Sequence, residues 1–123
     1  MIIVDTSALI ASLAGERLGA ARMKQLLIDG ERLVLPALAL YEWQRGPRRQ
    51  EELAAQEALL PSAAALPFDA AVAETAARLY RSVSRPRGRE MDLAIAAHAV
   101  VLDAELWTLN REDFADIPGL RLV

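Results

Sequence analysis

Oxygen-bearing side chains stand at positions in this chain from which they could meet around one metal ion. Asp5 directly follows the apolar run Ile2–Val4, and such a run is typical of a buried strand. Ligands bind at the carboxyl ends of strands in open parallel α/β sheets, so we expect Asp5 where chemistry occurs. Three further positions follow that could face the same cleft: Glu42, Asp92 and the turn that contains Asn110 and Asp113. Carboxylates that gather without a cation raise one another's pKa values, so the pattern predicts a divalent-metal site.

The chemistry expected of such a site is hydrolysis of a phosphodiester bond. Mg²⁺ prefers oxygen ligands at roughly 2.0–2.1 Å and keeps several waters, so two or three carboxylates suffice for one ion. The predicted ligands are Asp5, Glu42 and Asp92, and Mn²⁺ is an alternative ion. A bound cation makes water easier to deprotonate and shields the phosphate under attack. Neighbouring hydroxyls are expected to support the ligands or hold waters; they belong to Thr6, Ser7 and Thr108.

Each acid also has a simpler explanation. Asp5 could cap the next helix, and Glu42 could belong to a solvated helix face. Asp92 in a first helical turn is favoured by the helix dipole alone, and Asp113 is a common turn residue. The joint arrangement of these residues, rather than any one of them, indicates a site.

Strands alternate with helices along the chain. Apolar runs and breaker residues predict strands at 2–5, 33–35, 65–66, 105–109 and 120–123, and helices at 8–14, 18–28, 36–46, 50–60, 70–83 and 89–102. Ser7 and Asp69 are the expected N-caps of the first and fifth helices. The alternation implies an α/β fold, a three-layer α/β/α sandwich with a mainly parallel central sheet. No linker divides the chain, so residues 1–123 are expected to form a single domain.

The last long helix has the most regular apolar pattern. Ile95, Ala99 and Leu102 repeat at helical spacing and are predicted to be buried. The lone histidine, His98, lies nearly two turns beyond Asp92 and is not expected to act in catalysis.

Composition excludes several other classes of protein. The chain has 123 residues, 54% of them hydrophobic, which suits one folded domain with one core. There is no cysteine, hence no disulfide framework and no thiolate zinc site. No stretch of about 20 apolar residues exists to span a bilayer. These features favour a cytoplasmic protein without a membrane partner.

Arginines concentrate beside two of the acids. The net charge is −3, yet the 14 basic residues include only one lysine, and arginines gather at 45–49 and 81–89. An acidic cleft would repel a phosphate backbone, and arginines at its rim could hold that backbone by paired hydrogen bonds. The predicted RNA-binding residues are Arg45, Arg85, Arg87 and Arg89. The simpler alternative is that they are solvated surface charges.

Several segments, taken in order, match those of one family. They are Ile2–Ser7, the stretch from Leu35 through Glu42 to Gly46, Asp92–Ala99, Trp107–Phe114 and Ile117–Leu120. Together they resemble the PIN-domain ribonucleases, and in particular the VapC-type toxins of toxin–antitoxin pairs. Each segment alone is a weak match, but the similarity runs nearly end to end.

The resemblance implies a PIN-like fold and a Mg²⁺-dependent endoribonuclease with catalytic acids at Asp5, Glu42 and Asp92. The fourth family position falls most naturally on Asn110, with Asp113 as a supporting or alternative acid. An Asn there carries no charge, which weakens the case for a second metal ion. The resemblance further implies a homodimer, a cognate antitoxin that covers the cleft, and a tRNA or ribosomal RNA substrate.

Two other functions deserve comparison. A phosphotransfer domain with Asp5 as nucleophile fits poorly, because Ser7 stands where one such class has a second acid. The other class needs a lysine after a late strand, and the only lysine, Lys24, falls in an early helix. The remaining alternative is a non-catalytic RNA- or protein-binding module on the same fold.

Overall fold

A parallel sheet lies at the centre of the molecule. The structure is a computed structural model that describes residues 1–15 and 17–123. Within these residues the strands are β1 Ile2–Val4, β2 Leu33–Val34, β3 Glu105–Trp107 and β4 Arg121–Leu122. They form one sheet in the order β2-β1-β3-β4, and every neighbouring pair is parallel. The carboxyl ends of the two central strands, β1 and β3, therefore lie side by side, with Val4 paired to Trp107.

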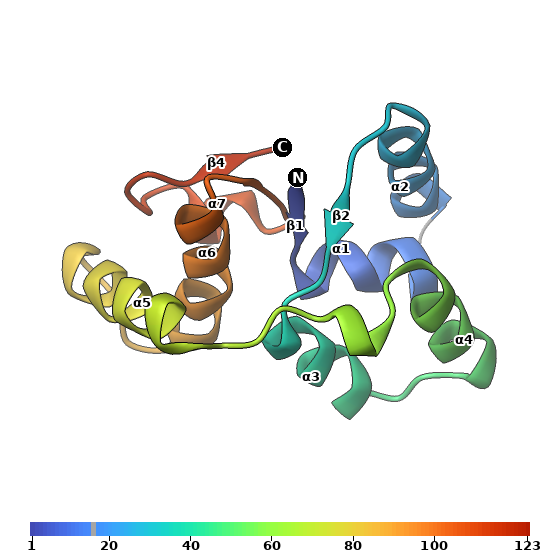
Figure 1. Ribbon diagram of the computed structural model, residues 1–123, viewed down its shortest axis with the longest axis horizontal. Coiled ribbons are helices and arrows are strands. Elements are labelled where there is room, and N and C mark those ends of the chain that lie inside the picture. Colours follow the sequence, from blue (N-terminus) through green and yellow to red (C-terminus); the bar gives the residue numbers. More distant parts are fainter. Residues whose placement is uncertain (16) are drawn as a thin grey trace.

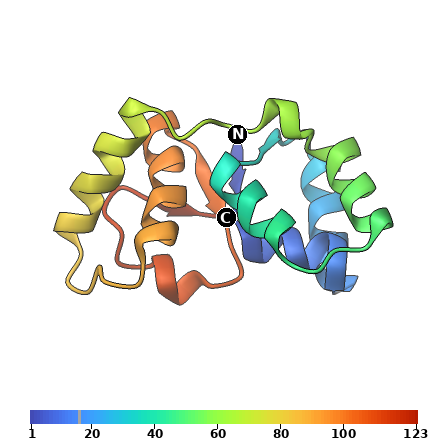
Figure 2. The ribbon, with the colours of Figure 1, turned by 90° about the horizontal axis from the view of Figure 1, so that it is seen from below.

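Helices flank the sheet on both sides. They are α1 Thr6–Ile10, the π-helix η1 Ala11–Gly15, α2 Arg17–Ile28, α3 Ala37–Arg45, α4 Gln50–Leu59, the 3₁₀ turn η2 Ser62–Ala64, α5 Ala70–Ser82, α6 Glu90–Leu102 and α7 Arg111–Phe114. In Figures 1 and 2, α5 and α6 lie to one side of the strands, and α1, α2 and α4 lie to the other. The prediction of an α/β/α fold with a parallel sheet is confirmed.

The core holds the strand that carries Asp5 in place. Ile2, Ile3 and Val4 of β1 are each at most 1% exposed. All seven residues from Leu93 to Ala99 are buried, because α6 packs against β1 and β3 on one side and against α5 on another. Buried apolar surface on each of these elements fixes the positions of β1 and α6 relative to each other.

The start of the first helix differs from its prediction. The helix begins at Thr6 rather than Ala8, and Asp5 rather than Ser7 occupies its N-cap position. The helix then continues as a π-helix to Gly15, the residue expected to end it. The second predicted helix begins at Arg17 rather than Leu18 and ends at Ile28 as expected. Sequence spacing misplaced the first boundary because the Ser7 hydroxyl has other partners, which are described below.

Smaller differences occur at other elements. Residues 65–66 do not form a strand; Leu66 makes a single parallel bridge with Pro36. The turn at 110–113 is largely the short helix α7. Leu102, predicted to be buried, is 42% exposed, because it lies in the last turn of α6, beyond the part that packs on the sheet. Asp69 does cap α5, and its carboxylate accepts a hydrogen bond from the Val72 amide at 3.0 Å.

Nowhere in residues 1–15 and 17–123 is there a helix whose length and apolar character would let it cross a bilayer.

Candidate active site

Asp5 is a buried carboxylate at the carboxyl end of β1. It is 3% exposed and sits at the N-cap position of α1, yet its side chain makes no capping hydrogen bond. Its Oδ2 atom instead accepts hydrogen bonds from the hydroxyls of Ser7 and Thr108, each at 2.8 Å. Thr108 directly follows β3, so residues from two adjacent strand ends hold this carboxylate. These contacts argue against the simple helix-cap explanation of Asp5.

The two hydroxyls are oriented by the backbone. The amide of Leu109 donates to Ser7 Oγ at 3.0 Å, and the amide of Asn110 donates to Thr108 Oγ1 at 3.0 Å. Each hydroxyl has one proton and two lone pairs; one lone pair accepts from the amide, and the proton is donated to Asp5 Oδ2, because a carboxylate oxygen can only accept. The two oxygens of Ser7 and Thr108 are also 3.2 Å apart. Asp5 is therefore held in one rotamer by a polar network at the strand ends.

Glu42 faces the same region from α3. Its Oε1 atom accepts a hydrogen bond from Thr6 Oγ1 at 2.7 Å, and its Oε2 atom lies 3.5 Å from an Nη atom of Arg45. The side chain is only 19% exposed. A residue of a purely solvated helix face would not be half-buried against Thr6, the neighbour of Asp5.

Asp92 lies in the first turn of α6, where its surroundings disfavour the charged form of its carboxyl group. Burial is the largest cause that raises the pKa of Asp92 to about 6. Three nearby negative charges raise this pKa further; they are those of Asp5, Asp113 and Glu42. The positive charge of Arg89 acts in the opposite direction. An acid placed only to meet the helix dipole would have a lowered pKa, so the dipole does not account for Asp92.

The two candidates for the fourth position differ in what surrounds them. Asp113, on α7, is exposed, and its charge acts on Asp92. Asn110 is exposed at the N-cap position of α7, where its side chain makes no capping hydrogen bond. A surface hollow of about 290 Å³ is lined by residues 109–113. Of the two side chains, only that of Asp113 adds negative charge near Asp92.

The donor set fits a hard divalent cation, although it does not form a complete cage. Among residues 1–15 and 17–123, no three Asp, Glu or His side chains lie close enough together to hold one ion at once. The predicted triple of Asp5, Glu42 and Asp92 is therefore not assembled as a single cluster; the Glu42 oxygens contact Thr6 and Arg45 instead. Mg²⁺ needs only one or two protein carboxylates and otherwise keeps its waters. A cation beside Asp5 and Asp92 would also relieve the charge repulsion recorded in the raised pKa of Asp92.

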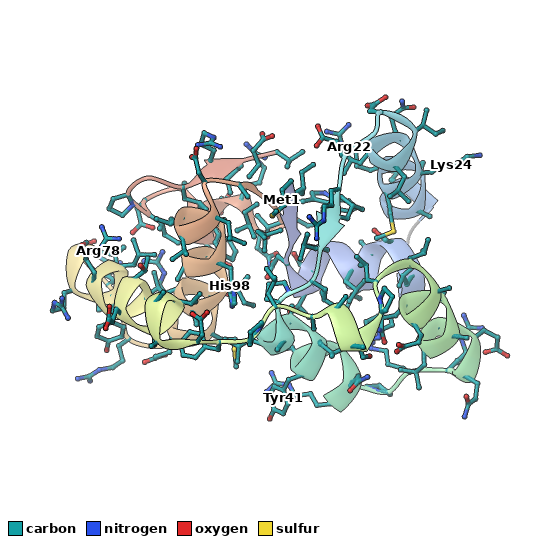
Figure 3. The ribbon with its side chains drawn as sticks, in the orientation of Figure 1. Met1, Arg22, Lys24, Tyr41, Arg78 and His98 are labelled. Carbon is teal, nitrogen blue, oxygen red and sulfur yellow. The ribbon has the colours of Figure 1, made fainter. Side chains whose placement is uncertain are left out.

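The four predicted RNA-binding arginines have different surroundings. Arg85 and Arg87 are exposed in the loop before α6. The guanidinium of Arg45 lies between Glu42 and the ring of Tyr41, with its Cζ 5.3 Å from the ring centroid. Tyr41 extends from α3 away from the strands (Figure 3).

Arg89 differs from the other three arginines. Its side chain is 20% exposed, and its guanidinium is bound to Asp116. Nothing in the local sequence pattern identifies Asp116 as a partner of Arg89, which lies 27 positions earlier.

His98 belongs to the core of the molecule. It is 1% exposed on α6 (Figure 3), and its ring centroid lies 6.3 Å from that of Phe68. Burial lowers its pKa, with a smaller opposing effect of Asp69. His98 is therefore a buried core residue that packs beside Phe68.

Known proteins resemble this chain over nearly its whole length. The sequence profile of the PIN domain family matches residues 2–120. Ribonuclease VapC19 of Mycobacterium tuberculosis is 33% identical over 123 residues, which cover 98% of this chain and 98% of the relative.

Solved structures show the same fold. One is VapBC2 from Rickettsia felis bound to a DNA fragment from their promoter, with a TM-score of 0.79 and 21% identity over 100% of this chain and 98% of that chain. DNA-bound VapBC from Salmonella typhimurium also has a TM-score of 0.79, with 20% identity over 99% of this chain and 96% of that chain. VapBC-5 from Mycobacterium tuberculosis, a member of the VapBC family of toxin-antitoxin systems, has a TM-score of 0.65 and 29% identity over 98% and 97% of the two chains.

Proposed function

This chain belongs to the PIN-domain family, and on that premise we propose that it is a metal-dependent endoribonuclease that hydrolyses RNA phosphodiester bonds. One relative, which matches over 98% of both chains, carries the name ribonuclease. We propose further that it is the toxin of a type II toxin–antitoxin pair, since several structures that share its fold are VapBC complexes.

One observation supports this function above all others. Burial, together with the charges of carboxylates from separate parts of the chain, raises the pKa of Asp92 to about 6. Those groups lie after β1, on α3 and on α7, and they are Asp5, Glu42 and Asp113. Protein folds rarely hold so much like charge together without using it.

In the proposed site, Asp5 and Asp92 hold the cation. Ser7 and Thr108 bind Oδ2 of Asp5, so Oδ1 is the oxygen that would be available to a cation. Glu42 completes the acidic group, directly or through a water, and Asp113 or Asn110 fills the fourth position. Mg²⁺, with Mn²⁺ as a substitute, would offset phosphate charge and make water a better nucleophile.

The arginines around the acids provide the RNA contacts in this proposal. Arg85 and Arg87 are exposed beside the start of α6 and are free to track a phosphate backbone. Arg45 currently neutralises part of the Glu42 charge, and the same guanidinium can pair with a phosphate when RNA arrives. Substitution of Arg85 and Arg87 by Ala is expected to weaken RNA binding and to flatten its dependence on salt.

We also propose how the protein works in its cell. Residues 1–123 act as one domain in the cytoplasm, the protein forms a homodimer, and a cognate antitoxin covers the cleft and silences it. Inhibition of RNA cleavage by the product of a small neighbouring reading frame would test the partner. Light scattering on the purified protein would test the dimer.

A cleavage assay on total RNA tests the enzymatic proposal. We expect cleavage in Mg²⁺, loss of cleavage in EDTA, and a loss of at least about 100-fold in an Asp5→Asn variant. Glu74→Gln is the matched control, because it removes one carboxylate charge from an exposed position on α5. Cleavage that survives both EDTA and Asp5→Asn would refute the proposal. RNA binding without cleavage under every metal tested would favour the non-catalytic binding module instead.

A further inference from the structure

Arg89 connects two segments that carry acids of the site. It immediately precedes α6, and its guanidinium binds both oxygens of the Asp116 carboxylate, at 2.6 and 3.0 Å. The same guanidinium donates to the backbone carbonyl of Asp113 at 2.8 Å and to that of Arg85 at 3.4 Å. The loop before α6 and the segment around α7 are thus joined by one side chain.

This connection restrains the backbone that carries two carboxylates of the site, those of Asp92 and Asp113. Asp92 lies three residues after Arg89 in the first turn of α6, and the Leu93 amide bonds to the Arg89 carbonyl at 2.9 Å. Asp113 offers its own carbonyl to the guanidinium, so the bond restrains the backbone from which the Asp113 carboxylate extends. Helices α6 and α7 also pack on each other.

The geometry of the contact requires arginine. A planar guanidinium can bind both carboxylate oxygens and still donate in the same plane to a carbonyl, which a lysine ammonium cannot do in a fixed geometry. Gly88 precedes Arg89 with a φ of +85°, a left-handed conformation that side chains rarely adopt and that sets the direction in which the chain enters α6.

These contacts point away from direct RNA binding by Arg89. Four hydrogen bonds within the protein occupy its guanidinium, and the side chain is 20% exposed. Arg85 and Arg87 of the same loop are exposed instead. A phosphate could form a paired contact with both Nη atoms of Arg89 only by displacing Asp116.

We propose that Arg89 is a positioning residue for the reaction: through Asp116 and the Asp113 carbonyl, it holds Asp113 opposite Asp92 at the metal-binding edge of the sheet. This inference rests on the proposed nuclease function for its catalytic consequence. Its structural consequence, the docking of α7 on the start of α6, does not depend on that function.

The substitution that tests the proposal is Asp116→Asn, which keeps the side-chain size and weakens the pair without touching Arg89. The matched control is Asp103→Asn, which weakens another short Arg–Asp pair, Arg121–Asp103 at 2.6 Å, away from the site. Arg89→Lys, which keeps the charge but not the planar geometry, is the second test variant.

The first measurement is Mn²⁺ affinity of the full chain by titration calorimetry, together with kcat and KM on RNA at a temperature where all variants are folded. We expect Asp116→Asn and Arg89→Lys each to weaken Mn²⁺ binding or lower kcat about tenfold, with KM for RNA little changed. Asp103→Asn should leave both unchanged. If Arg89 were an RNA contact, Asp116→Asn would release it and tighten RNA binding, and that result would overturn the proposal.

The second measurement needs neither metal nor RNA. Amide hydrogen exchange at residues 111–114 should become at least about tenfold faster in Asp116→Asn than in the wild type, and not in Asp103→Asn. If the wild type binds no Mn²⁺ and cuts no RNA, the nuclease proposal fails while hydrogen exchange still decides the role of Arg89. Unchanged hydrogen exchange at residues 111–114 in Asp116→Asn would contradict the proposed positioning role of Arg89.

Discussion

Replacement of Asp92 by Asn is expected to make the metal-free protein more stable while it removes activity. The carboxyl of Asp92 has a pKa of about 6, against an ordinary value of 3.8. Fully counted, that difference corresponds to roughly 3 kcal/mol by which folding disfavours the charged form at neutral pH. The carboxyl is half-exposed, so solvent screening reduces the expected gain to about 1–2 kcal/mol. For a domain of this size, the melting temperature should rise on the order of 5 °C.

The sign of the pH dependence follows from the raised pKa. Below the ordinary pKa of 3.8, Asp92 is protonated in both folded and unfolded states and costs nothing. As the pH rises from there through about 6, the unfolded state loses this proton more readily, and the wild type loses stability relative to Asp92→Asn. The advantage of the variant should therefore be full at pH 7.5 and fall to about a third of that at pH 4.5.

Urea denaturation in EDTA at the two pH values measures this difference. Glu90→Gln is the control, because Glu90 is an exposed acid in the same first turn of α6; its effect should stay within about 0.5 kcal/mol of zero, or be slightly destabilising through the helix dipole. Added Mg²⁺ should raise the stability of the wild type more than that of Asp92→Asn. A variant that is less stable at pH 7.5, or whose gain is equal at both pH values, would refute the electrostatic reasoning.

Two further substitutions test the support of the site and the packing of the fold. Thr108→Val removes the hydroxyl that donates to Asp5 at 2.8 Å, and it should lower RNA cleavage about 10- to 100-fold, whereas Thr108→Ser, which keeps the hydroxyl, should retain most activity. Gly19→Ala would place a Cβ 2.5 Å from the backbone carbonyl of Ala11, and it should destabilise the protein by about 1–3 kcal/mol in urea denaturation despite the better helix propensity of Ala. Gly15→Ala, whose Cβ would meet its nearest atom at 3.8 Å, is the control and should change stability little.

The parts of the fold that rest on hydrophobic pattern could be predicted from the sequence. The run Ile2–Val4 is fully buried as the first strand, and Asp5 follows it at the carboxyl end of that strand. The apolar spacing of α6 placed Ile95 and Ala99 in the core. Local pattern suffices in these cases because burial on both faces leaves an apolar segment few alternatives.

The parts that depend on distant partners could not be predicted. Leu102 fits the same periodic pattern as Ile95 but lies at the end of α6 and is 42% exposed, and spacing along the helix does not tell where its packing against the sheet ends. Ser7 looks like a helix cap, yet its partners are Asp5 and the amide of Leu109, which is 102 residues away. A hydroxyl can hydrogen-bond to the backbone or to a nearby carboxylate, so sequence spacing alone does not predict which partner Ser7 has.

The central claim is that Asp5 and Asp92 share a divalent cation at the carboxyl end of β1. Anomalous diffraction from a crystal of the protein with Mn²⁺ locates the ion directly. The account predicts a peak about 2.1 Å from a carboxylate oxygen of Asp5 and of Asp92, and its disappearance in Asp5→Asn. Mn²⁺ bound only elsewhere on the molecule, or the same peak in the Asp5→Asn crystal, would contradict it.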